Sequence, residues 1–189
     1  MVTTLDITEQ TDEQLAAEAI REGSDGPAFT ALVHRHQERV WRICYRLLSN
    51  EHDASDAAQD VFVSLFLHRA SFAGRSRFTT WLHAIAVRTC LSLRRARGRR
   101  ARRETILNEG QQAEPAGNQS SDTEGLALDL SQMLETLDEE DRALVILKYA
   151  ESYSYEELAD VFDLSVSACK MRVSRAREEL QQRFPDQTL

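Results

Sequence analysis

Apolar residues recur at intervals of three and four along most of this chain, and almost no segment alternates every second residue as a strand does. This spacing predicts helices. A short first helix opens with Thr11 and Gln14 in the pattern of a capping box, and a second helix opens with Pro27 at its first position. Further helices are expected from about Asp53 and from about Phe78, the last of them running into a block of arginines.

A change of composition divides the chain. Residues 104–125 are rich in Gln, Ser, Asn, Glu, Gly and Pro and offer little to bury, which predicts a flexible linker. We therefore predict an all-α protein of two small helical domains joined by this linker, the second domain containing a helix-turn-helix. The expected boundaries are a disordered N-terminus at 1–11, a first domain at 12–103, the linker at 104–125, a second domain at 126–184 and a tail at 185–189.

The second domain carries the helix-turn-helix pattern. A helix opening at Tyr155 is followed by a turn at Asp163 and by Ser165, whose hydroxyl suits the N-cap of the next helix. In that next helix the apolar positions face inward, which leaves a polar set for the major groove of DNA. The set consists of Ser167, Lys170, Met171, Arg172, Ser174 and Arg175. Arg172 suits a bidentate contact to guanine, and the motif alone also fits a solvated basic helix.

The charge is segregated along the chain. The net charge is −8, yet residues 61–103 contain no Asp or Glu. Eleven arginines lie in this stretch, at positions 69, 75, 77, 88, 94, 95, 97, 99, 100, 102 and 103. Such segregation predicts a local positive surface on an acidic protein, and the local field governs the attraction of phosphate.

Other function classes find little support in the sequence. Phosphate-binding loops, nucleophile elbows, zinc-protease motifs and dinucleotide turns are all missing, so an enzyme is disfavoured and no cofactor is expected. Cys44, Cys90 and Cys169 lie far apart, which indicates free thiols. His34 and His36 point to different faces of a predicted helix, with no Cys or carboxylate at ligand spacing nearby, so no metal site is expected. No apolar run approaches the roughly 20 residues that span a bilayer, and residues 1–10 do not resemble a signal peptide. We expect a cytoplasmic protein without membrane insertion of its own.

Several segments resemble one family in the same order along the chain. Residues 53–66 are similar to the polymerase-binding helix of extracytoplasmic-function (ECF, group IV) RNA polymerase sigma factors, and residues 71–88 to the segment that reads and opens the −10 element. Residues 134–142, 153–159 and 174–180 resemble the family's −35-reading domain. The chain departs from the pattern at Arg88, where many relatives carry Asn, and at Asp138, which replaces a frequent Pro.

The resemblance implies partners and site residues. The partners would be core RNA polymerase, through its β′ clamp and β flap, promoter DNA, and an anti-sigma factor that holds the protein inactive. The polymerase-binding residues would be Asp56, Gln59, Asp60, Phe62 and Leu65. The −10 residues would be Phe72, Arg75, Ser76, Arg77, Phe78, Thr79, Thr80, Arg88, Arg94 and Arg95, which offer ring faces, hydroxyls and guanidinium groups.

Two other functions stay open at this point. A DNA-binding regulator that works without polymerase would keep the helix-turn-helix and the basic helix, but it would not need the acidic face at Asp56, Gln59 and Asp60. Tight binding to isolated duplex DNA would favour it. An enzyme would be favoured only by turnover of a nucleotide in the absence of polymerase.

Overall fold

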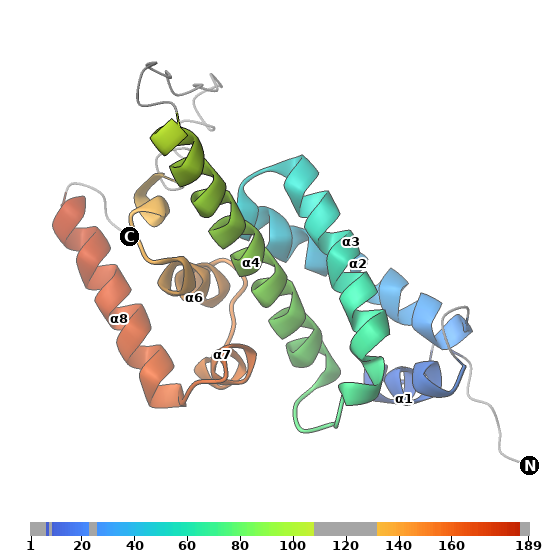
Figure 1. Cartoon of the computed structure of the whole chain (residues 1–189). Helices are drawn as coiled ribbons and strands as arrows, with labels where there is room; N and C mark the ends of the chain where they lie inside the picture. The colour runs from blue at the N-terminus through green and yellow to red at the C-terminus, as the bar shows by residue number, and fades with distance from the viewer. Residues whose placement is uncertain (1–6, 8, 23–25, 108–131, 186–189) are drawn as a thin grey trace, which may run out of the picture.

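The regular structure is helical throughout the described part of the chain, which confirms the all-α prediction (Figure 1). This computed structural model describes residues 7, 9–22, 26–107 and 132–185. The α-helices are α1 (Asp12–Glu22), α2 (Pro27–Leu48), α3 (Glu51–His68), α4 (Phe78–Leu107), α6 (Glu139–Tyr149), α7 (Tyr155–Phe162) and α8 (Val166–Arg183). A 3-10 turn at Arg69–Ser71 follows α3, and a short helical turn at 132–135 precedes α6. Most of the predicted linker, at 108–125, lies outside the described residues, and α4 continues four residues past the expected end of the first domain.

Local capping signals account for most helix ends. The Thr11 hydroxyl accepts from the Gln14 amide and the Gln14 side chain accepts from the Thr11 amide, as the capping box predicts. Ser165 caps α8 by accepting from Ala168 N at 3.1 Å. Asn50 caps α3 in the same way, so this helix begins at Glu51, two residues earlier than the sequence pattern suggests.

The first four helices share one apolar core. Leu15, Leu32, Val61 and Leu82 come from four different helices and are each at most 1% exposed. Burial of such side chains supplies most of the stability of a small helical domain. Cys44 and Cys90 are fully buried here. A hydrogen bond to the Cys44 thiol, together with burial, raises the pKa of Cys90, so the Cys90 thiol stays protonated. Structural packing accounts for both cysteines.

Helices α6, α7 and α8 form the second unit. Ser154 and Glu157 make a capping box that opens α7, and Asp163 ends it in the left-handed conformation with φ of 56°. Leu158, Cys169 and Val173 are buried where the two helices cross, as the helix-turn-helix prediction requires. Asp163 therefore takes the turn position for which Gly is the easier residue.

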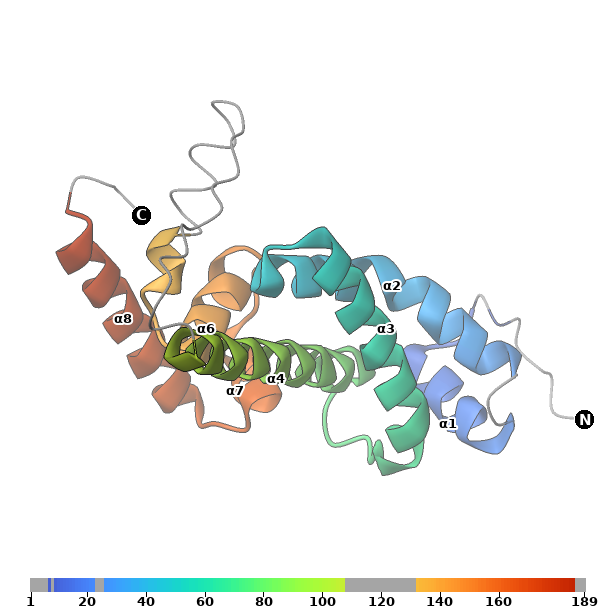
Figure 2. The same ribbon diagram turned by 45° about the horizontal axis from the view of Figure 1, so that its top comes forward.

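The two units pack against each other along α4. One side of this helix contacts α2 and α3 and the other side contacts α6 and α7, so a continuous buried core joins both units (Figures 1 and 2). The sequence pattern predicts two domains and a linker but gives no sign of this contact. At its centre the Tyr153 hydroxyl hydrogen-bonds to Nδ1 of His83, and both residues are only 4% exposed.

The His83–Tyr153 contact predicts a pH-dependent stability. Burial lowers the pKa of His83 from 6.5 to about 3, and Arg39 and His36 act in the same direction. Below pH 6.5 the unfolded chain therefore binds a proton that the folded chain rejects. As the pH is lowered from 6.5 to 3, the free energy of unfolding should therefore fall, with this residue contributing up to about 1.4 kcal/mol per pH unit.

The variant His83→Gln keeps an acceptor for Tyr153 but cannot titrate. Urea denaturation at several pH values gives the slope of the unfolding free energy against pH. For the variant this slope should correspond to about one proton fewer taken up on unfolding than for the wild type. Equal slopes for the two proteins would contradict the assignment.

Candidate nucleic-acid and partner interfaces

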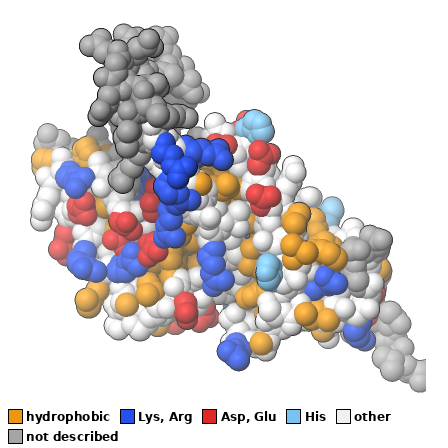
Figure 3. Space-filling model, viewed as in Figure 1, with side chains coloured by type: hydrophobic (Ala, Val, Ile, Leu, Met, Phe, Trp, Pro, Cys, Tyr) orange, Lys and Arg blue, Asp and Glu red, His pale blue; other side chains and the backbone are white. Residues whose placement is uncertain are grey.

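One exposed stripe runs along the outer face of α3. Asp56, Gln59 and Asp60 are exposed, as predicted, and Figure 3 shows acidic side chains over this helix beside an exposed apolar patch. The same stripe continues to Val63 and Leu67, which are 56% and 66% exposed. Positions 56, 60, 63 and 67 are separated by four, three and four residues, so they lie on one helix face. The stripe thus combines carboxylates with apolar side chains.

The structure corrects one apolar residue of the predicted α3 set. Leu65 is 1% exposed and belongs to the core, so it offers no surface to a partner. Phe62 is half-buried, as a rim residue would be. Continuing the exposed spacing from Asp56 and Asp60 finds Val63 directly, whereas Leu65 follows the buried face of the helix.

An open groove lies between α2 and α3, next to this stripe. Val33, Trp41, Gln59, Phe62 and Val63 are among the residues that line it, and its volume is about 820 Å³. Trp41 is held in place because its indole N–H donates to the Ser55 hydroxyl at 3.1 Å and its ring stacks on Tyr45. The groove is lined by apolar side chains together with polar ones such as Gln37 and Glu38, which suits a helical segment of a partner.

The segment between α3 and α4 presents fewer aromatic faces than the sequence suggests. Phe78 is 1% exposed and Thr80 is 4% exposed, so neither can contact a base in this conformation. Phe72 is half-buried, with its ring 5.5 Å from Phe78 and 5.3 Å from Trp81. Both corrected residues lie in the first turn of α4, whose inward side is already part of the core.

The polar groups of this segment remain available. Arg75 and Arg77 are exposed, and Ser76 and Thr79 are half-buried. Gly74 has φ of +65°, a value that L residues seldom adopt, and this turns the chain sharply within the loop. The backbone N–H of Phe78 donates to Glu13 of α1 at 3.1 Å, which ties the end of the loop to the core. The loop is therefore held at its end with basic and hydroxyl side chains outward.

Basic side chains gather along the outer part of α4, as Figure 3 shows. Arg88 is exposed, as expected of a phosphate contact. Arg94 and Arg95 are engaged instead: Arg94 pairs with Glu139 at 2.6 Å and Arg95 with Glu140 at 2.8 Å. Both carboxylates belong to α6, in the other unit. Two of the five arginines that the family resemblance assigns to the −10 DNA are thus paired across the contact between the units.

The recognition helix α8 exposes most of its predicted set. Ser167, Lys170, Met171, Ser174 and Arg175 are exposed, with Met171 at 62%. The Ser174 hydroxyl donates to Glu178 at 3.0 Å, one turn further along the helix. Lys170 lies with Nζ 5.6 Å from the centre of the Tyr155 ring, and Lys148 lies 4.5 Å from it. Two lysines, one from α6 and one from α8, therefore lie over the Tyr155 ring at the start of α7.

Arg172 is the exception within this set. Its side chain is only 20% exposed, because it pairs with Asp141 at 2.5 Å and with Glu140 at 3.1 Å on α6. In this conformation it holds α8 on α6 and cannot reach a guanine edge. Its position next to the buried Cys169 and Val173 is the only local sign that Arg172 is not fully exposed, because its acidic partners lie about thirty residues earlier in the sequence.

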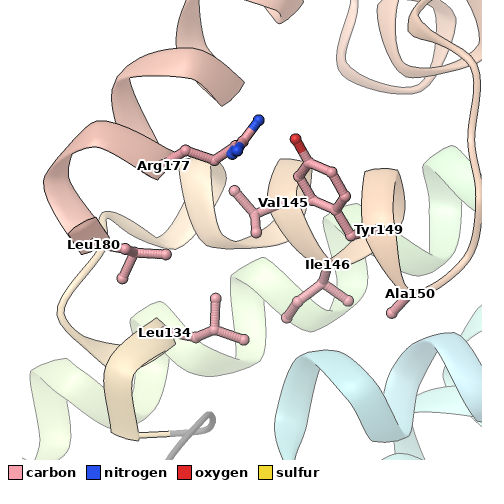
Figure 4. A pocket seen from close by; sticks show the side chains of 7 residues that line it. All are labelled: Leu134, Val145, Ile146, Tyr149, Ala150, Arg177 and Leu180. Carbon is pink, nitrogen blue, oxygen red and sulfur yellow. The ribbon is translucent and has the colours of Figure 1, made fainter. Parts of the chain in front are cut away.

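A second groove, which the sequence analysis did not predict, lies between α6 and α8 (Figure 4). Leu134, Ile146 and Leu180 form its apolar part, and its volume is about 400 Å³. Tyr149 is 53% exposed at one end, where Arg177 lies 5.9 Å from the ring centre. This groove also suits the apolar face of a helix, with a cation at its rim.

Two classes of site are not found in the described part of the chain. None of its helices combines the length and the apolar composition needed to cross a membrane. Its His, Cys, Asp and Glu side chains form no group of three or more that could bind a metal ion.

Comparison with known proteins identifies the family of each unit. Residues 32–100 match the Sigma-70 region 2 family, and residues 127–180 match Sigma-70, region 4. The chain is 32% identical to the ECF RNA polymerase sigma-E factor of Haemophilus influenzae, over 94% of this chain and 98% of that protein.

Two solved structures share the fold. One is CnrH in complex with the cytosolic domain of CnrY, with a TM-score of 0.66 and 25% identity over 95% of this chain and all of that one. The other is the sigma factor RpoE in complex with the anti-sigma factor NepR from Bartonella quintana, with a TM-score of 0.62 and 27% identity over 85% of this chain and 98% of that one. This chain belongs to the ECF family of RNA polymerase sigma factors, the proteins that give core RNA polymerase its promoter specificity.

Proposed function

We propose that this sigma factor binds the β′ clamp of core RNA polymerase through the α3 stripe and the α2–α3 groove. The observation that carries the proposal is the exposure of Val63 and Leu67 in line with Asp56 and Asp60. Exposed apolar side chains on a polar helix mark a contact surface. A DNA-binding regulator that acts alone has no use for such a surface, because acidic residues repel phosphate.

For the −10 element we propose that the loop after α3 holds unpaired bases. Phe72 offers the accessible part of its ring, Ser76 and Thr79 offer hydroxyls, and Arg75 and Arg77 offer contacts to the backbone. Phe78 packs beneath Phe72 and positions it. Opening a duplex without ATP requires such trapping of unstacked bases by stacking and hydrogen bonds.

For the −35 element we propose that the exposed side of α8 enters the major groove. Ser167, Lys170, Met171 and Ser174 lie near its N-terminal half, where a recognition helix contacts bases, and Arg175 is placed for a phosphate. Arg172 stabilises the packing of α8 on α6 through its ion pairs with Glu140 and Asp141.

Two further partners follow from the family and from the second groove. We infer that the groove around Leu134, Ile146 and Tyr149 takes the helix of the β flap, since it is apolar and open and lies on the α6–α8 side of the unit. We also infer that an anti-sigma factor controls the protein, because both solved relatives named above were captured with a second protein.

Run-off transcription tests the proposed function. Purified core polymerase from a related bacterium should yield discrete new transcripts from a pool of genomic promoter fragments only when this protein is added. The shared upstream sequences would supply the −10 and −35 preferences. An absence of transcripts together with an absence of any stable complex with core polymerase would favour the polymerase-independent regulator.

Charge reversal on α3 tests the polymerase contact. The double variant Asp56→Arg/Asp60→Arg should weaken binding to core polymerase at least tenfold, because two positive charges would then face a basic clamp surface. The fold should survive, since both side chains are exposed. Asp160→Arg, at an exposed site on α7, serves as the control and should bind core polymerase like the wild type. Fluorescence titration measures the affinity and circular dichroism the fold; full affinity in a folded double variant would refute the contact.

Two arginines of α8 form a matched pair for the promoter contact. Arg172→Ala should lower the free energy of unfolding by about 1–2 kcal/mol, because it leaves charged groups on α6 without their partner. Arg175→Ala should change stability by less than about 0.5 kcal/mol, yet lower promoter affinity of the holoenzyme and reduce its salt dependence by about one phosphate. Urea denaturation and salt-dependent binding separate the two. The reverse pattern would show that Arg172 is the DNA contact.

A further inference from the structure

Helix α4 receives an N-terminal cap from a residue far away in the sequence. Arg77 occupies the cap position, since its carbonyl accepts from the Trp81 amide at 3.1 Å. The guanidinium of Arg77 offers no acceptor to the amides of the first turn, which lack partners within the helix. Oε1 of Glu13 on α1 accepts from the Phe78 amide instead, at 3.1 Å and across 65 residues of sequence. A carboxylate at this end of a helix also interacts favourably with the helix dipole.

Helix α1 is itself anchored to α2, so the backbone that carries Glu13 is held in place. One carboxylate oxygen of Asp12 accepts from Arg35 at 3.1 Å, and the other lies 2.9 Å from Nε2 of His36. Arg35 also donates to the carbonyl of Gln10 at 2.8 Å. The residue next to Glu13 is thus bound through both of its carboxylate oxygens, which limits the positions that the Glu13 side chain can take.

These contacts hold Phe78 from two directions. Its backbone amide is bound by Glu13, and its ring lies 5.7 Å from the ring of His36, which Asp12 holds. The Phe78 ring in turn lies 5.5 Å from the Phe72 ring, edge to face. Phe72 lies in the loop between α3 and α4, so a displacement of Phe78 removes the surface on which the Phe72 ring rests.

We propose that Glu13 is a positioning residue for recognition of the −10 element, acting through Phe78 on Phe72. The proposal rests on the proposed function, which assigns the loop between α3 and α4 to unpaired bases. It extends the −10 site to α1, a helix that precedes the residues matching Sigma-70 region 2 at 32–100. The cap raises the fraction of molecules in which the loop is already in place, and the apparent affinity for bases follows that fraction.

The charge of Glu13 by itself predicts the opposite effect on DNA binding. A carboxylate beside a DNA-binding loop repels phosphate, so removal of the charge alone strengthens binding. Removal of the cap instead weakens binding, because the loop is then less often in place. The sign of the change therefore distinguishes a positioning role from a purely electrostatic one.

Helix α1 offers a matched control near its other end. Oε2 of Glu22 accepts from the Ala28 amide at 3.1 Å, so this glutamate caps the start of α2 as Glu13 caps the start of α4. Both glutamates are exposed residues of the same helix. Glu22→Ala therefore removes a cap of the same kind from a different helix. Glu13→Gln keeps an acceptor oxygen and removes only the charge.

Hydrogen exchange in the free protein tests the cap. In Glu13→Ala the Phe78 amide should exchange at least about tenfold faster than in the wild type, because it has lost a bond to a charged acceptor. Glu13→Gln should keep most of the protection. In Glu22→Ala the Ala28 amide should exchange faster while the Phe78 amide is unchanged. An unchanged rate at Phe78 in Glu13→Ala would overturn the cap.

Binding by the reconstituted holoenzyme tests the positioning role. One probe is a promoter fragment recovered by run-off transcription, duplex across the −35 element and single-stranded across the −10 element. The other probe is the same duplex ended before the −10 element. Glu13→Ala should bind the first probe at least about fivefold more weakly than the wild type, and the second probe and core polymerase equally well. Glu13→Gln and Glu22→Ala should match the wild type to within about twofold on both probes.

Three results would overturn the positioning role. Equal losses in Glu13→Ala and Glu22→Ala would assign the effect to general stability. Tighter binding by Glu13→Ala would assign it to charge, and a loss in Glu13→Gln as large as in Glu13→Ala would exclude the acceptor oxygen as its cause. A failure of the proposed function gives a different result: the wild-type holoenzyme then binds both probes equally or does not form, while hydrogen exchange still decides whether Glu13 caps α4.

Discussion

Helix α4 is packed on two sides, and every proposed interface takes its position from this constraint. One side completes the core with α2 and α3, while the other receives α6 and α7. The loop between α3 and α4 joins the helix at its first turn, where buried Phe78 anchors it. The basic side chains follow on the outer part of the same helix. A single rigid element therefore sets the loop, the arginines and the second unit relative to one another.

Segregation of charge explains how an acidic protein can serve as a DNA-binding factor. The arginines of α4 create a local field that differs in sign from the net charge of −8. The carboxylates elsewhere are arranged in two ways: those at Asp56 and Asp60 on α3 face outward, and those at Glu139 and Glu140 on α6 pair with arginines of α4.

Features set by local signals could be predicted from the sequence. The caps at Thr11 and Ser165, the turn at Asp163 and the inward positions of the helix-turn-helix all depend on neighbours within a few residues. Leu65 was misplaced because the boundary between the buried and exposed faces of a helix depends on what packs against it. Phe78 and Thr80 fall into the core for the same reason, since only the tertiary structure shows which side of the first turn of α4 is covered.

Arg172 and the contact between the units could not be predicted, because their partners lie far away in sequence and no local pattern specifies the pairing. The four carboxylates of residues 138–141 are visible in the sequence, but an acidic first turn is also favourable to any helix. Their second role depends on the approach of α4. Long-range electrostatic pairing is thus the part of this structure that a single sequence leaves undetermined.

The length of α4 has a geometric consequence for the promoter. Thirty residues of α-helix extend about 45 Å, which matches about 13 base pairs of B-form DNA. If its arginines follow the DNA backbone, the helix spans this distance upstream of the −10 bases before the predicted linker begins. The predicted linker then has to cover only the rest of the interval to the −35 element.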